Sequence, residues 1–167
     1  EQDAWAIPLY SGIVATWGLV GALLVTRRPD NRVGWVLLVV GLGIGLALLG
    51  QLWTYLSLAR FEGSLPGTGA GAVLGLLFQP SFFLVMLVPL LFPDGRLMSR
   101  RWAVVAALLL LSAAATLIGG LTKPGPVEGM PLVENPLGMP ALGELPQALI
   151  DLGGTGALVC IPAGILA

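Results

Sequence analysis

Side chains that could do chemistry are few in this chain of 167 residues, and they form no catalytic arrangement. The sequence contains no histidine, so the commonest metal and haem ligand is absent. It contains one cysteine, Cys160, so neither an intrachain disulfide nor a pair of cysteine metal ligands can form. No basic tract typical of nucleic-acid binding is present. We therefore predict no enzyme activity, no catalytic residue, no metal, no cofactor and no nucleic-acid partner.

Three polar side chains inside apolar stretches are the candidates for a ligand-binding site: Gln51, Gln79 and Asp151. A polar group at depth in a membrane is costly and is often functional. At about 1.5 Å per helical residue, both glutamines lie roughly 12–14 Å below the outer ends of their stretches. Pro80 has no N–H, so it should free a backbone carbonyl beside Gln79. We therefore predict an outward-opening pocket around the three side chains.

Two simpler interpretations of these side chains stay open. The glutamines can instead form one interhelical hydrogen bond with each other, worth about 0.6–2 kcal/mol in a membrane. Asp151 lies about a turn and a half into its stretch, so its carboxylate can reach the headgroup region instead of a pocket. A closed pair of glutamines without a cavity would remove the basis for the predicted site.

The elements that must position these residues are long apolar helices. Hydrophobic residues make up 56% of the chain and charged residues 10%, whereas an average soluble domain has about 25% charged residues. A helix needs about 20 mostly apolar residues to span a bilayer, and it satisfies its own backbone hydrogen bonds there. Five stretches meet this requirement, at residues 4–26, 33–59, 70–92, 102–121 and 146–167. We predict an all-α fold: a polytopic transmembrane bundle of about five spanning helices, forming one domain over residues 1–167.

The basic residues between these stretches predict how the bundle is oriented. Two connections hold six of the eight basic residues of the chain, namely Arg27, Arg28, Arg32, Arg96, Arg100 and Arg101. The positive-inside rule places both connections in the cytoplasm, and it places the N-terminus and residues 122–145 outside. Each arginine can bind an anionic lipid headgroup at about 1 kcal/mol, or it can serve only to anchor the topology.

Small residues at four-residue spacing let helix backbones approach closely in lipid. They recur on three predicted helices, as Gly41 and Gly45, Gly71 and Gly75, and Gly156 and Cys160. These faces either pack the bundle internally or bind another chain, so we expect the lipid bilayer and a homodimer or other membrane subunit as partners. The chain starts without Met and stops inside an apolar stretch, so we expect a segment of a longer protein.

Three motifs at the membrane boundaries carry a family resemblance. They are Arg-Arg-Pro-Asp-Asn-Arg-Val-Gly-Trp at residues 27–35, Leu-Leu-Phe-Pro-Asp-Gly-Arg-Leu-Met-Ser-Arg-Arg-Trp at residues 90–102, and Asn-Pro-Leu-Gly at residues 135–138. In this order the set resembles the N-terminal transmembrane sensor region of actinobacterial-type sensor histidine kinases. Arg32 and Met98 stand where that family favours proline, and both positions lie in loops. The resemblance implies a bacterial inner membrane and a kinase output domain further along the chain.

These observations favour a sensor region of a bacterial two-component-type protein, which passes an envelope or membrane cue to a cytoplasmic output domain. The segment itself has no phosphoacceptor histidine, so it cannot autophosphorylate. The alternative is a structural or accessory subunit of a larger membrane complex. A small transporter fits less well, because buried charges and paired broken helices are scarce in the sequence.

Overall fold

The computed structural model describes residues 6–97 and 99–165, and it is all-α apart from one short hairpin. Long apolar runs form the helices, and the Pro- and Gly-rich outer segment forms the hairpin. The helices are α1 (Ala6–Arg27), α2 (Arg32–Phe61), α3 (Thr68–Gly75), α4 (Phe78–Val85), α5 (Leu87–Leu91), α6 (Arg100–Thr122) and α7 (Leu145–Ile165). The antiparallel strands are β1 (Pro126–Val127) and β2 (Met130–Glu134), and a 3-10 turn covers Pro140–Leu142. The all-α prediction is confirmed.

Three helical stretches of the described chain are long and apolar enough to cross a membrane: Arg32–Phe61, Thr68–Leu91 and Arg100–Thr122. These three suggest a membrane protein. The first and last predicted helices correspond to α1 and α7, in which the described apolar segments Val14–Arg27 and Leu145–Cys160 are shorter. Residue 4 at the predicted start and residue 167 at the predicted end lie outside the described residues. A total of five spanning helices therefore stays a prediction.

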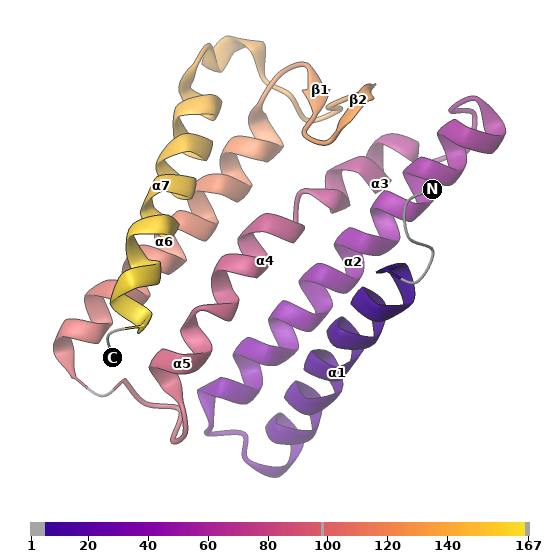
Figure 1. The fold of residues 1–167 in the computed structure, drawn as a ribbon. Helices are drawn as coiled ribbons and strands as arrows, with labels where there is room; N and C mark the ends of the chain where they lie inside the picture. Colours follow the sequence, from indigo (N-terminus) through magenta and orange to yellow (C-terminus); the bar gives the residue numbers. More distant parts are fainter. Residues whose placement is uncertain (1–5, 98, 166–167) are drawn as a thin grey trace.

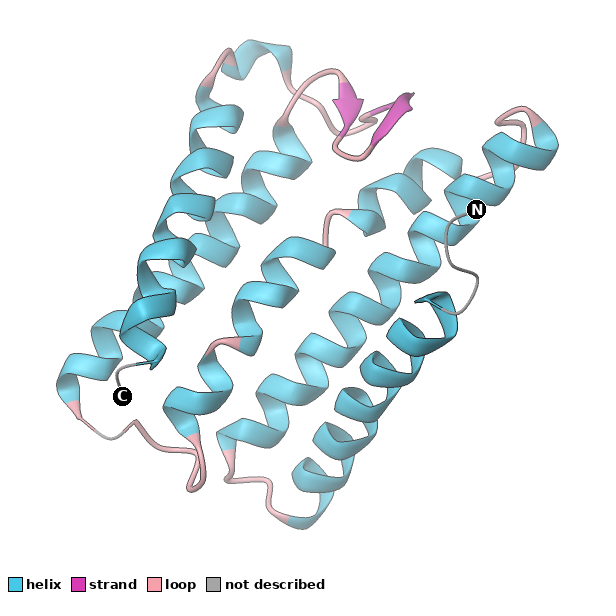
Figure 2. Cartoon of the chain, viewed as in Figure 1, coloured by secondary structure: helices cyan, strands magenta, loops and turns pink. Residues whose placement is uncertain are grey.

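The third predicted helix, residues 70–92, is not one continuous helix but three shorter ones (Figure 2). Pro80 and Pro89 have no N–H to give to the carbonyls of Leu76 and Val85, so the regular helical hydrogen-bond ladder is interrupted one turn before each proline. The chain tightens at both breaks, where the N–H of Leu76 donates to Val73 O at 3.1 Å and that of Met86 to Phe83 O at 3.1 Å. The helical stretch predicted at residues 70–92 is therefore present as Thr68–Leu91, with interruptions one turn before Pro80 and one turn before Pro89.

The helices are arranged side by side in chain order, from α1 at one edge to α7 at the other (Figure 1). Helix α1 packs on α2, and α7 packs on α6, while α4 and α5 lie between α2 and α6. No close packing of α1 against α6 or α7 is found among the described residues. The bundle therefore consists of two closely packed helix pairs joined by a broken middle helix.

Glycines make the close contacts within each pair. A Cβ added at Gly41 of α2 would lie 2.6 Å from the Cα of Gly18 on α1. A Cβ at Gly156 of α7 would collide with the hydroxyl of Ser112 on α6. Gly45 makes no such contact, because a Cβ there would meet nothing within 4 Å. Gly45 lines an open apolar groove between α1 and α2 instead.

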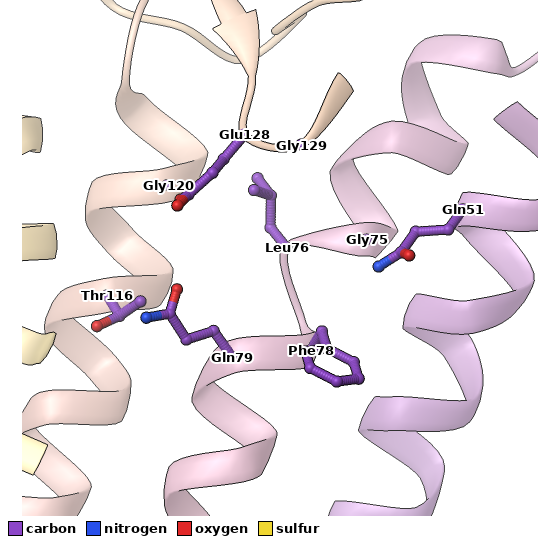
Figure 3. A pocket seen from close by; sticks show the side chains of 9 residues that line it. All are labelled: Gln51, Gly75, Leu76, Phe78, Gln79, Thr116, Gly120, Glu128 and Gly129. Atoms are coloured by element: carbon purple, nitrogen blue, oxygen red, sulfur yellow. The ribbon is translucent and has the colours of Figure 1, made fainter. Parts of the chain in front are cut away.

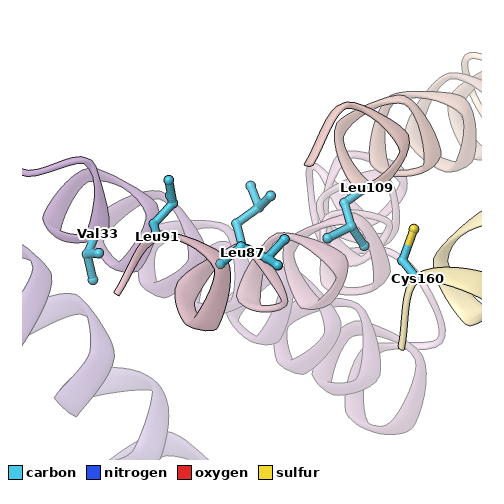
Figure 4. Close-up of a cluster of buried hydrophobic side chains, with 6 residues drawn as sticks. Val33, Leu87, Leu91, Leu109 and Cys160 are labelled. Carbon is cyan, nitrogen blue, oxygen red and sulfur yellow. The ribbon is translucent and has the colours of Figure 1, made fainter. Parts of the chain in front are cut away.

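One apolar cluster joins the two pairs near the arginine-containing loops (Figure 4). It brings together buried side chains from α2, α5, α6 and α7: Val33, Leu87, Leu90, Leu91, Leu109 and Cys160. In lipid the hydrophobic effect adds little to such contacts, so close van der Waals packing has to hold them. This cluster therefore holds the two helix pairs together near the arginine-containing loops.

The six arginines named above and the hairpin lie at opposite ends of the bundle (Figure 1). We call the end formed by residues 27–32 and 92–101 the arginine end, and the end formed by residues 62–67 and 123–144 the hairpin end. The hairpin end holds Glu62, Glu128, Glu134 and Glu144, and its basic residues are Lys123 and, in the adjoining last turn of α2, Arg60. The two ends therefore differ in the sign of their charge.

Candidate ligand-binding cavity

A cavity of about 170 Å³ lies at the hairpin end, between the two helix pairs (Figure 3). Helix α2, the break between α3 and α4, helix α6 and the turn of the hairpin all contribute to its lining. The lining residues are Gln51, Gly75, Leu76, Phe78, Gln79, Thr116, Gly120, Glu128 and Gly129. Three of the nine are glycines, which leave the space that side chains would otherwise fill.

Gln51 and Gln79 both line this cavity and are both half-buried. The side chain of Gln51 extends from α2 toward Gly75, and that of Gln79 extends toward Thr116 on α6 (Figure 3). No hydrogen bond joins the two glutamines, and no protein partner for either amide at this site is found among the described residues. Both carboxamides are therefore available to a ligand or to water, and their role in ligand binding stays a prediction.

The helix break leaves a backbone acceptor at a residue that lines the same cavity. Pro80 cannot donate to the carbonyl of Leu76, and Leu76 itself lines the cavity. No other donor to this carbonyl is found in the described part of the chain. A carbonyl without a partner at depth in a membrane costs free energy. A ligand or water with a donor group would recover that free energy.

The hairpin forms the roof of the cavity and is attached to both helix pairs. Its buried residues Val127 and Val133 pack with Ala72 of α3. On the other side, the Nδ2 of Asn135 donates to the carbonyls of Gly120, Leu121 and Lys123 at 3.0, 3.1 and 2.9 Å. Asn135 therefore satisfies the last turn of α6, where backbone acceptors lack helical partners. The hairpin places the carboxylate of Glu128 at the cavity.

Asp151 is not brought to this cavity. It is exposed on α7, where its Oδ1 accepts a hydrogen bond of 2.8 Å from Nε2 of Gln147 one turn earlier. Helix α7 packs on α6, and the cavity lies between α6 and the middle helices. Residues of α2, α3, α4 and α6 thus line the cavity, whereas the sequence predicted a pocket around Gln51, Gln79 and Asp151.

Sequence reasoning missed Thr116 and Glu128. Thr116 lies on α6, a helix with no polar residue that suggested a site, and its buried hydroxyl has no hydrogen-bond partner. That hydroxyl faces Gly153 of α7 rather than the cavity. The tight turn that carries Glu128 could have been predicted, since Glu128 and Gly129 form a two-residue connection between Val127 and Met130, and Gly129 has a φ of +79°. The position of this turn at the cavity could not.

The arginine end is built by contacts between its two loops. The Oδ1 of Asn31 accepts from the N–H of Val33 at 2.9 Å and so caps α2. The Nδ2 of the same side chain donates to the carbonyl of Pro93 at 3.3 Å. The indole N–H of Trp35 donates to the carbonyl of Pro29 at 2.9 Å. The residues behind the family resemblance therefore have structural roles here.

Comparisons of this chain with protein-family models, with curated proteins and with solved structures found no match. Among the described residues, no group of three His, Cys, Asp or Glu side chains is placed to hold a metal ion. The class of protein is inferred from the chain itself. It is all-α, with three helical stretches long and apolar enough to cross a membrane and a small cavity between two helix pairs.

Proposed function

We propose that this chain is the transmembrane sensor region of a bacterial two-component-type signalling protein in the inner membrane. In this proposal a cue from the envelope or the membrane enters the cavity at the hairpin end. Its binding changes how the α1–α2 pair and the α6–α7 pair are arranged, and α7 carries that change to a cytoplasmic output domain. The resemblance of the three boundary motifs to sensor histidine kinases supports the family named here.

The orientation that we propose follows from charge. The arginine end faces the cytoplasm, because an excess of Lys and Arg marks cytoplasmic loops. The hairpin end and the N-terminus face outward. The chain then crosses the membrane several times, and the cavity opens toward the envelope.

The single observation that carries the sensor proposal is the position of the cavity. It lies where Gln51 of α2, Gln79 of α4 and Gly120 of α6 meet, so a molecule bound there touches both helix pairs. The break between α3 and α4 is at the same place, and a broken helix can bend more easily than a continuous one. A ligand shifts such an equilibrium when it binds the two arrangements unequally.

The lining indicates the chemistry of the cue. The carboxylate of Glu128 accepts hydrogen bonds, and the two glutamine amides can accept or donate them. No basic side chain is among the lining residues. These groups favour a small molecule with hydrogen-bond donors, and a positive charge on it would pair with Glu128.

The alternative is a structural or accessory subunit of a larger membrane complex. The apolar groove between α1 and α2 favours it, with a volume of about 420 Å³ and Gly18, Gly41 and Gly45 in its lining. Small residues of this kind let a helix of another chain approach closely. Either a second copy or a different subunit could supply that helix.

The coding sequence beyond residue 167 distinguishes the two functions. The sensor proposal expects an in-frame basic segment, a dimerising helix pair with a phosphoacceptor histidine, and an ATP-binding domain. A stop codon directly after residue 167 would contradict it and would favour the accessory subunit.

A further inference from the structure

We call the cavity lined by Gln51 and Gln79 the glutamine cavity. A second cavity, of about 400 Å³, lies at the opposite end of the bundle, the arginine end. Residues from two loops separated by more than sixty positions in the sequence line it, and neither loop forms it alone. The lining residues are Arg27, Arg28, Pro29, Asp30, Asn31, Pro93, Asp94 and Arg96. We call it the arginine cavity.

The two loops that form the arginine cavity are held together by a hydrogen bond and by a close backbone contact. Besides the hydrogen bond from Asn31 to Pro93, Gly95 is buried against Asn31 with a φ of +72°. A Cβ at Gly95 would lie 2.6 Å from Asn31 Oδ1 and 2.7 Å from the N of Arg32, so only glycine fits. The arginines on the two loops are therefore held at one cavity by defined contacts.

The charges of the lining select an anion with further polar groups. Three guanidinium groups line the cavity with two carboxylates, from Asp30 and Asp94. In the described part of the chain, no ion pair within 4.0 Å joins these groups to each other. The guanidinium N–H groups are thus free to bind a ligand. Two parallel N–H groups of one guanidinium can donate to two oxygens of the same phosphoryl group. Carboxylates only accept hydrogen bonds, so they suit hydroxyl groups on the same ligand.

We propose that the arginine cavity binds the headgroup of a hydroxyl-bearing anionic phospholipid, with the phosphoryl group on the arginines and the hydroxyls on the aspartates. Phosphatidylglycerol has this chemistry. The volume of the cavity admits a glycerophosphate group, and a loop at the end of a spanning helix lies at the depth of lipid headgroups. The proposal depends on the membrane location of the chain and is independent of its role as a sensor.

The experiment measures phosphatidylglycerol binding to the chain in phosphatidylcholine nanodiscs, by titration with headgroup-labelled lipid. The test variant is Arg27→Gln with Arg96→Gln. The matched control is Arg32→Gln with Arg101→Gln, which removes the same charge at the same end from exposed arginines outside the cavity lining. We expect the test pair to weaken binding about tenfold more than the control pair, since only the former loses bidentate contacts.

Equal losses in the two variants would overturn the proposal and would leave only general attraction between arginines and an anionic surface. A second variant, Arg27→Lys with Arg96→Lys, keeps the charge and serves as the test if the glutamine variant does not fold. It should still bind phosphatidylglycerol more weakly than wild type, because lysine cannot make the bidentate contact. Phosphatidylmethanol, which lacks the hydroxyls, should bind more weakly than phosphatidylglycerol. Binding of soluble glycerol phosphate or inorganic phosphate without binding of the lipid would refute the lipid as the ligand.

Discussion

Asn31 and Asn135 stabilise opposite ends of the bundle with the same carboxamide group. Asn31 accepts through Oδ1, which caps the start of α2, and donates through Nδ2 to the carbonyl of Pro93 at 3.3 Å. Asn135 mainly donates, since its Nδ2 contacts three carbonyls at the end of α6. Aspartate has nearly the same shape but is acceptor-only when ionised. The same substitution should therefore have different effects at the two positions.

We predict that Asn135→Asp lowers the free energy of unfolding by about 1–3 kcal/mol, because it leaves three carbonyls without their donor and adds a negative charge at a helix C-terminus. Asn31→Asp should lower stability by less than Asn135→Asp, because aspartate is as good an N-cap as asparagine and only the 3.3 Å hydrogen bond to Pro93 is lost. Thermal unfolding of both variants in the same detergent checks this. A loss at Asn31 equal to that at Asn135 would contradict these roles.

At the residue scale, sequence reasoning could find the two glutamines, because their depth follows from counting along apolar runs. It could not place Asp151, because depth says nothing about which face of α7 a side chain occupies. Asp151 and Gln147 are four residues apart, and a local hydrogen bond between them leaves the carboxylate at the surface. Glu128 reaches the cavity through the tertiary packing of the hairpin, which no local pattern specifies.

At the element scale, glycines decide how closely the helices pack, and Gly41 and Gly45 differ although they are one turn apart. We predict that Gly41→Ala lowers the free energy of unfolding by about 1–3 kcal/mol, because its Cβ would lie 2.6 Å from the Cα of Gly18. Gly45→Ala should be neutral or stabilising, because a Cβ there meets nothing within 4 Å and alanine favours helix. Unfolding in detergent provides the measurement, and a reversed order of the two stabilities would disprove this packing.

The boundaries of α2 and α6 could be predicted to within a few residues, since apolar runs flanked by charges define both ends of a helix. The spacing of small residues indicated close packing but not which glycines make it, so it could not distinguish Gly41, which contacts α1, from Gly45, which does not. The loss of a helical hydrogen bond at Pro80 in the third helix was predicted from the sequence, whereas the same effect of Pro89 was not considered. Pro80 and Pro89 both lie inside its apolar run, and each removes one helical hydrogen bond.

At the scale of the whole molecule, the charge difference between the two ends predicts the orientation in the membrane. Single cysteines at Ser99 and Glu134, in a chain with Cys160→Ala, should react with a membrane-impermeant thiol reagent from opposite sides. Both positions are exposed and lie at opposite ends of the bundle. Labelling of Ser99 from inside and of Glu134 from outside is the expected result. Labelling of both from one side would refute the topology.

The central claim is that the glutamine cavity controls the arrangement of the two helix pairs, and a cavity-filling substitution tests it without knowledge of the ligand. A Cβ at Gly120 would have only ordinary contacts, the nearest 3.5 Å from Leu76, so the side chain of Gly120→Leu can extend into the cavity. The matched control is Gly154→Leu on α7, where a Cβ would meet nothing within 4 Å. Both variants add the same side chain.

The measurement is the distance distribution between spin labels at Leu23 of α1 and Val104 of α6, both exposed, in nanodiscs with Cys160 replaced by alanine. We predict that Gly120→Leu shifts the main distance by about 2 Å or changes the populations of two distances, because helix shifts of this size accompany switching. Gly154→Leu should leave the distribution unchanged. Identical distributions in the unsubstituted chain and both variants would contradict the account.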